Sequence, residues 1–193
     1  MIVELRRYTL RDGRRDELID LFDREFVETQ EALGMAVLGQ FRDLDRPDQF
    51  VWLRGFTDMS SRRAGLTAFY SGRVWAKHGP AANATMLDSD DVLLLREIVP
   101  LPVFDRGAAH PATVLHATIW YSACPFPDSV PSADETLAVL RTEYAENDFP
   151  QLPVRDEHAL VLLSRSPLQA DVPTQVVKTD NLRLCPTRRS TLH

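Results

Sequence analysis

Residues 2–99 contain, in order, a strand, a helix, two strands, a helix and a strand, and residues 113–190 repeat this order in reduced form. Repeated units of this kind stack or pair, because each unit has an apolar face that it cannot bury alone. The pattern therefore predicts two halves, residues 1–100 and 113–193, joined by a proline-containing linker at residues 101–112.

The elements of the first half follow from hydrophobic periodicity and turn residues. We expect strands over residues 2–10, 35–43, 49–57 and 92–99, and helices over residues 14–33 and 60–70. Ser60 or Ser61 is expected to cap the second helix. A further short helical segment at residues 73–78 should be disturbed by Gly79 and Pro80, because proline lacks a backbone donor.

The second half has weaker patterns. Residues 132–146 begin with capping-box spacing and predict a helix with Leu137, Leu140 and Tyr144 facing inward. Strands are expected over residues 113–121, 152–156, 159–165 and around 182–184. This half has a single predicted helix, so it is the degenerate copy.

Antiparallel strands with two helices on one face form a ferredoxin-like unit, so the predicted fold class is α+β. The opposite sheet face also needs a cover, and the second half can supply it. Packing of the two sheets then encloses a barrel-like space. The barrel closes within one chain if the second half suffices, and otherwise two chains must pair as a homodimer.

Strand alternation predicts which side chains face that space. On the first strand, Val3 and Leu5 are assigned to the helix side, which turns Glu4, Arg6 and Tyr8 the other way. The same reasoning turns His116, Thr118 and Trp120 inward in the second half. The predicted pocket residues are Arg6, Trp52, Arg54, Phe56, Trp75 and Trp120. Aromatic walls with a few polar groups are typical of small-molecule sites.

Composition limits the classes of function. The chain has 193 residues and a net charge of -6, and its arginines are dispersed, which argues against a nucleic-acid partner. No apolar run has the length of a membrane span, and charge near the N-terminus argues against a signal peptide, so we expect a cytoplasmic protein. Cys124 and Cys185 are isolated, and the histidines lack metal-site spacing, so neither a disulfide nor a metal is expected.

The segment Val3–Leu10, the helix after Gly13 and the motif Phe50–Phe56 together resemble the opening of the NIPSNAP family. The resemblance covers residues 2–99, and residues 182–190 are similar to the closing segment of two-copy members. It implies the dimeric α/β-barrel fold. The biochemistry of the family is largely undefined, and the related barrels include cofactor-free monooxygenases and haem-handling enzymes.

The candidate catalytic residues are His116, Glu4, Tyr8 and His78. His116 is the favoured base, with Glu4 or Tyr8 to orient it, although a histidine hydrogen-bonded for structural reasons is the commoner case. His78 follows Trp75 at a helix end and offers a base or a haem ligand. The haem-handling relatives also use a strand asparagine that this first strand lacks, so no cofactor is expected and haem is the alternative.

Two hypotheses follow. In the first, the protein binds a small apolar or aromatic molecule between the sheets, as a cofactor-independent monooxygenase-like or isomerase-like enzyme. In the second, the protein is a non-catalytic assembly module whose polar sheet face mediates oligomerisation. A space filled by side chains, with Glu4 paired to Arg6 or Arg54, would favour assembly. An open cavity that reaches His116 or Trp120 would favour a ligand.

Overall fold

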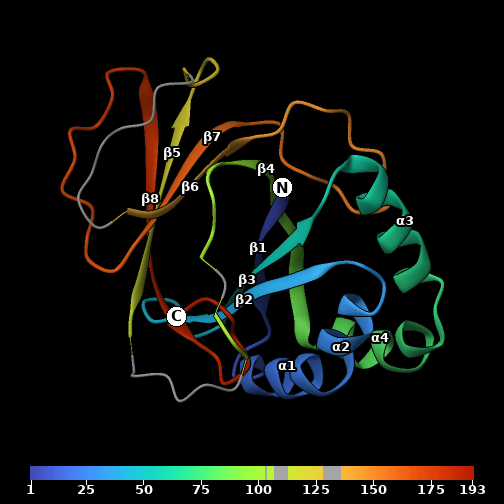
Figure 1. The fold of residues 1–193 in the computed structure, drawn as a ribbon. Coiled ribbons are helices and arrows are strands. Elements are labelled where there is room, and N and C mark those ends of the chain that lie inside the picture. The colour runs from blue at the N-terminus through green and yellow to red at the C-terminus, as the bar shows by residue number, and fades with distance from the viewer. Residues whose placement is uncertain (103, 107–112, 128–135) are drawn as a thin grey trace.

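The structure is a computed structural model that describes residues 1–102, 104–106, 113–127 and 136–193. Eight antiparallel strands form a closed barrel in the order β1-β3-β2-β8-β5-β7-β6-β4 (Figure 1). The strands are β1 (Ile2–Leu10), β2 (Ala36–Asp43), β3 (Gln49–Phe56), β4 (Met86–Val99), β5 (Leu115–Ser122), β6 (Thr136–Thr142), β7 (His158–Ser164) and β8 (Val176–Pro186). This α+β barrel confirms the predicted class.

The two halves share one strand order. In each half the first strand lies between the third and the fourth, and the second strand lies at an edge beside the third. Two pairings join the halves, β2 with β8 and β4 with β6, so the barrel closes within one chain. A closed barrel has no unpaired edge, so no second chain is needed to complete it.

Among the described residues, the helices cover the outside of the first half (Figure 1). They are α1 (Arg15–Leu21), the π-helical turn η1 (Phe22–Phe26), α2 (Val27–Glu31), α3 (Met59–Tyr70) and α4 (Arg73–Thr85). Gly13 precedes the first helix and Gly34 follows α2, and both have the positive φ that glycine tolerates best. In the described part of the chain, no helix is both long and apolar enough to cross a membrane.

Two helix predictions of the first half need correction. Asp58, and neither Ser60 nor Ser61, caps α3, because its side chain accepts a hydrogen bond from the backbone of Ser61 at 2.7 Å. Helix α4 continues through Pro80 to Thr85, held by the packing of buried Ala82 against the helix-side core.

The helix expected over residues 132–146 is wrong from residue 136 onward, and residues 132–135 lie outside the described residues. Thr136–Thr142 is strand β6, and Tyr144 is exposed. Pairing with both β4 and β7 buries this segment and overrides its helical spacing. The strand expected at residues 152–156 is also wrong, since this segment is irregular, although the backbone N–H of Arg155 donates to the backbone oxygen of Val92.

The barrel interior is filled with apolar side chains from all eight strands. They include Val3, Leu5, Phe41, Val51, Leu53, Leu93, Leu95, Ala117, Ile119, Leu140, Val161 and Leu182. Arg7 is a charged residue on the same face of β1: it reaches Asp180 at 2.8 Å and Asp91 at 2.9 Å and joins the two halves. The predicted open space between the sheets is therefore absent from this region of the barrel.

The predicted facing of β1 is the wrong way round. Val3 and Leu5 face the barrel, whereas Tyr8 packs in the core beneath the helices, and Glu4 and Arg6 share its face. β1 is buried on both faces, so polarity alone does not show which face meets the helices. This polar face is covered by the helices of the same chain.

Candidate functional site

A buried carboxylate surrounded by guanidinium groups lies between the sheet and the helices. Glu4 Oε2 accepts hydrogen bonds from Arg6 Nη1 at 2.8 Å and from Arg54 Nη2 at 2.6 Å. Glu4 Oε1 accepts one from Arg62 Nε at 2.8 Å. The side chains of Glu4, Arg54 and Arg62 have no exposed surface, and that of Arg6 is 2% exposed. Strand β1 supplies Glu4 and Arg6, β3 supplies Arg54 and α3 supplies Arg62.

Several of the remaining donors of the arginines have further partners, whereas Arg62 Nη2 has none among the described residues. Arg62 reaches Asp148 at 2.7 Å, Arg54 reaches the side-chain oxygen of Gln30 at 3.0 Å, and Arg6 Nε donates to the Tyr8 hydroxyl at 2.9 Å. Three guanidinium groups therefore face two carboxylates, those of Glu4 and Asp148. One positive charge is left over in a buried setting, where charge is costly unless it is paired.

The protonation states of this cluster follow from its contacts. Burial alone would raise the pKa of Glu4, but Arg54, Arg6 and Arg62 outweigh it and hold that pKa far below its ordinary range. Burial raises the pKa of Tyr8, although Arg6 opposes this. Glu4 is thus a fixed anion and Tyr8 a neutral phenol at neutral pH, so neither is poised as a general base.

A cavity of about 500 Å³ opens beside Arg6. Its walls come from β1, α3, α4, the start of β4 and the segment after β6. The lining residues are Arg6, Tyr8, Thr67, Tyr70, Ser71, Trp75, Asn83, Met86, Ser89, Asp90, Phe149, Gln151 and Leu152. Phe149 stacks on Tyr70 with ring centroids 5.9 Å apart, so the second half completes a wall. The size and the aromatic lining suit a small organic ligand.

A small void of about 30 Å³ shares Tyr8, Tyr70 and Trp75 with the cavity and is also lined by Trp52 and Arg54. The Trp52 side chain is 2% exposed, yet its indole N–H has no hydrogen-bond partner among the described residues. A buried donor without a partner is unusual in proteins and requires an acceptor, from solvent or from a ligand.

The predicted pocket residues of the first half come together, but on the helix side of the sheet. Arg6 and Trp75 line the cavity, and Trp52 and Arg54 line the adjoining void. Phe56 lies against Arg54, whose guanidinium carbon is 5.5 Å from the ring centroid. The grouping was therefore predictable from the sequence, whereas the side of the sheet was not.

The remaining candidates lie elsewhere. His116 and Thr118 share an outer face of β5 with Trp120, which packs with Phe126 and Leu162 in a separate cluster, so their predicted inward facing is wrong. His78 Nε2 is 3.4 Å from Glu25, and His78 is not among the residues that line the cavity. With no asparagine on β1, this arrangement does not fit a haem held by His78.

Sequence reasoning missed Arg62, Tyr70 and Phe149. Arg62 and Tyr70 lie on the predicted second helix, and the helical repeat places Arg62 on the same side as buried Leu66 and Phe69. A buried arginine at such a position is a usable signal. Phe149 lies in an irregular segment of the second half, and no local pattern connects it to the first half.

Residues 3–98 match the sequence model of the NIPSNAP family. The chain carries a NIPSNAP domain. This domain spans nearly all of β1–β4 and the helices of the described residues. It includes Glu4 and its three arginines, whereas Asn147 and Asp148, which both contact Arg62, lie outside it. No curated protein sequence matches the chain.

Solved structures resemble the chain in two ways. A NIPSNAP family protein of Agrobacterium tumefaciens is 23% identical with a TM-score of 0.44, and the match covers 48% of this chain and 90% of that one. A Lactobacillus acidophilus protein provisionally assigned as a monooxygenase is 10% identical with a TM-score of 0.59, covering 96% and 93%. A Fusobacterium nucleatum protein with the same provisional assignment is 8% identical with a TM-score of 0.56, covering 96% and 91%. The last two show that the whole barrel has a known fold.

Proposed function

We propose that this protein binds a small aromatic molecule with an anionic or hydrogen-bond-accepting group in the cavity beside Arg6. The observation that carries the proposal is the surplus guanidinium charge beneath an aromatic cavity. Arg6 shares Glu4 with two other arginines and lines the cavity floor. An oxyanion on a ligand would balance this surplus charge, and such charge-assisted contacts are the strong ones.

The unpartnered indole N–H of Trp52 supports the same ligand chemistry. It lies at the inner end of the site, where the Arg54 guanidinium carbon is 5.0 Å from the Trp52 ring centroid. The inner end therefore offers hydrogen-bond donors. The carboxylate of Glu4 is not available there as an acceptor, because it already accepts hydrogen bonds from three arginines. Aromatic rings around the rest of the cavity would contact the flat body of the ligand.

The proposal also includes a catalytic role. The likeness to provisionally assigned monooxygenases is one of fold, and it favours an oxygenase-like or isomerase-like reaction without a resident cofactor. Glu4 and Tyr8 are poor bases, so a substrate that binds already ionised, as a phenolate or carboxylate, would need no proton transfer to either of them. We also propose that both halves are copies of a ferredoxin-like unit, because they share one strand order.

Substitution of Arg6 by methionine tests the proposal with 1-naphthoate as the probe and 1-naphthalenemethanol as its uncharged counterpart. We expect the wild type to bind naphthoate more tightly than the alcohol. Arg6→Met should weaken naphthoate binding about tenfold or more and leave the alcohol unchanged, because the lost contact is to a charged group. Calorimetric titration measures both affinities.

Arg63→Met is the matched control, since Arg63 is the exposed neighbour of Arg62 on α3. It removes the same charge without touching the cavity. Equal affinities for the acid and the alcohol, or equal effects of the two substitutions, would contradict an anion site at Arg6.

A further inference from the structure

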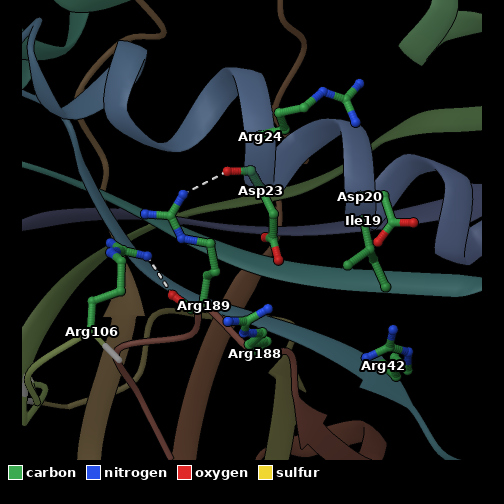
Figure 2. Close-up of a pocket in the computed structure, with 8 residues that line it drawn as sticks. All are labelled: Ile19, Asp20, Asp23, Arg24, Arg42, Arg106, Arg188 and Arg189. Carbon is green, nitrogen blue, oxygen red and sulfur yellow. Dashed lines mark hydrogen bonds between the residues drawn. The ribbon is translucent and has the colours of Figure 1, made fainter. Parts of the chain in front are cut away.

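A second cavity, of about 570 Å³, lies on another part of the surface (Figure 2). It is formed by α1, η1, β2, residue 106 of the linker and the residues just after β8. Its lining consists of Ile19, Asp20, Asp23, Arg24, Arg42, Arg106, Arg188 and Arg189. Five guanidinium groups therefore border one hollow in a chain whose net charge is -6. Such a local excess has to be explained by the contacts of each arginine.

Two of these arginines hold the C-terminal segment and residue 106 against the helices. Arg189 donates to the backbone oxygen of Asp23 at 2.7 Å and pairs with Glu28. Arg106 pairs with Glu31 and donates to the backbone oxygen of Arg189 (Figure 2). These contacts are structural, and the paired carboxylates do not line the cavity.

The other arginines retain unused donors. Arg42 binds Asp16 through Nε and Nη2, which leaves its Nη1 group without a hydrogen bond in the described structure. Arg24 pairs with the adjacent Glu25. Arg188 is exposed and has no hydrogen bond or ion pair with any described residue. A guanidinium carries five donors, so Arg188 and Arg42 together offer a donor-rich edge.

Asp20 and Asp23 are the opposing charges within the cavity. Burial raises the pKa of Asp23 to about 6, against the opposing effect of Arg189 and Arg106. Asp23 also accepts a hydrogen bond from Gln40 at 3.3 Å, which an uncharged side-chain oxygen there could accept as well. Asp23 therefore reduces the positive potential of the cavity without being needed as the partner of an arginine side chain.

We infer that this cavity is a binding site for a tetrahedral dianion, a phosphate group, held chiefly by Arg188 and Arg42. The two arginines come from different segments, β2 and the residues after β8, and approach the cavity from separate positions (Figure 2). Oxygens that point in several directions suit such an arrangement, and arginine is well suited to phosphate. The phosphate is either inorganic or the end of a larger molecule, for which the volume leaves room.

Sulfate, inorganic phosphate and methyl phosphate are the probes, titrated by calorimetry at constant ionic strength with chloride, because salt screens exposed charges. We expect saturable binding of one dianion per chain. Arg188→Ala should weaken binding about tenfold or more, and Asp23→Asn should strengthen it, because an opposing charge is removed. Tighter binding of methyl phosphate than of inorganic phosphate would identify an organic phosphate, and the reverse order would identify the free ion.

Arg183→Ala is the control, because Arg183 is an exposed arginine of β8 that pairs with Asp45 away from the cavity. It should leave dianion binding unchanged. Three results would overturn the inference: no saturable binding to the wild type, equal losses in the Arg183 and Arg188 variants, or weaker binding after Asp23→Asn. Thermal unfolding of each variant without ligand separates these effects from loss of fold.

Discussion

Glu4→Gln should lower the free energy of unfolding by about 3–5 kcal/mol, the usual cost of removing one partner from a buried ion pair. The substitution keeps the shape of the side chain but leaves Arg6, Arg54 and Arg62 with one carboxylate, Asp148, among them. Like charges would then face one another with no exposed surface to hydrate them. Urea unfolding followed by tryptophan fluorescence measures the change.

The effect of Glu4→Gln on the free energy of unfolding should depend on pH. The pKa of Glu4 is held far below its ordinary value of 4.5, so its contribution to stability is complete above that value and is lost as the pH falls. The wild type should therefore lose about 2 kcal/mol through this group between pH 7 and pH 3, and the variant should not. The stability gap between the two should narrow by that amount.

Glu17→Gln is the control, because Glu17 pairs with Arg14 on the surface with 52% of its side chain exposed. It should change the stability by less than about 0.5 kcal/mol. If Glu4→Gln proved as mild as the control, or if the gap stayed constant with pH, the cluster would not be held together by charge.

Residues 1–102, expressed alone, should not form a stable monomer. The fragment would keep β1–β4 and α1–α4, but the barrel-facing side chains of these strands, such as Val3, Leu53 and Leu95, would lose their cover. The edges of β2 and β4 would also lose their partners β8 and β6. An apolar sheet face with two open edges favours pairing with another copy or aggregation.

Analytical ultracentrifugation of the fragment and of the full chain tests this expectation. The fragment should sediment as a multiple of its own mass or precipitate, and it should bind naphthoate weakly, since Phe149 and Leu152 are missing from the cavity wall. A monomeric fragment with cooperative unfolding would show instead that the first half is stable without the second. The same measurement on the full chain shows separately whether intact molecules associate.

The strands and helices of the first half could be predicted from the sequence because its signals are local. Gly13 and Gly34 bound strongly periodic segments, and each predicted strand and helix of this half is present, although α4 continues to Thr85 and β4 begins at Met86 instead of residue 92. The strands of the second half were harder to predict. Thr136–Thr142 pairs on both sides with strands distant in sequence, and no local signal reports that pairing.

The candidate site, too, was only partly predictable from the sequence. The sequence by itself determined that Glu4, Arg6, Tyr8, Trp52 and Arg54 share one face of a sheet, because alternation along paired strands requires it. Only the tertiary structure decided that this face lies beneath the helices, that Arg62 joins Glu4, and that Phe149 closes the cavity. The physical reason is that strands buried on both faces have no polar side exposed to water, so the choice of face depends on which contacts pair the buried charges.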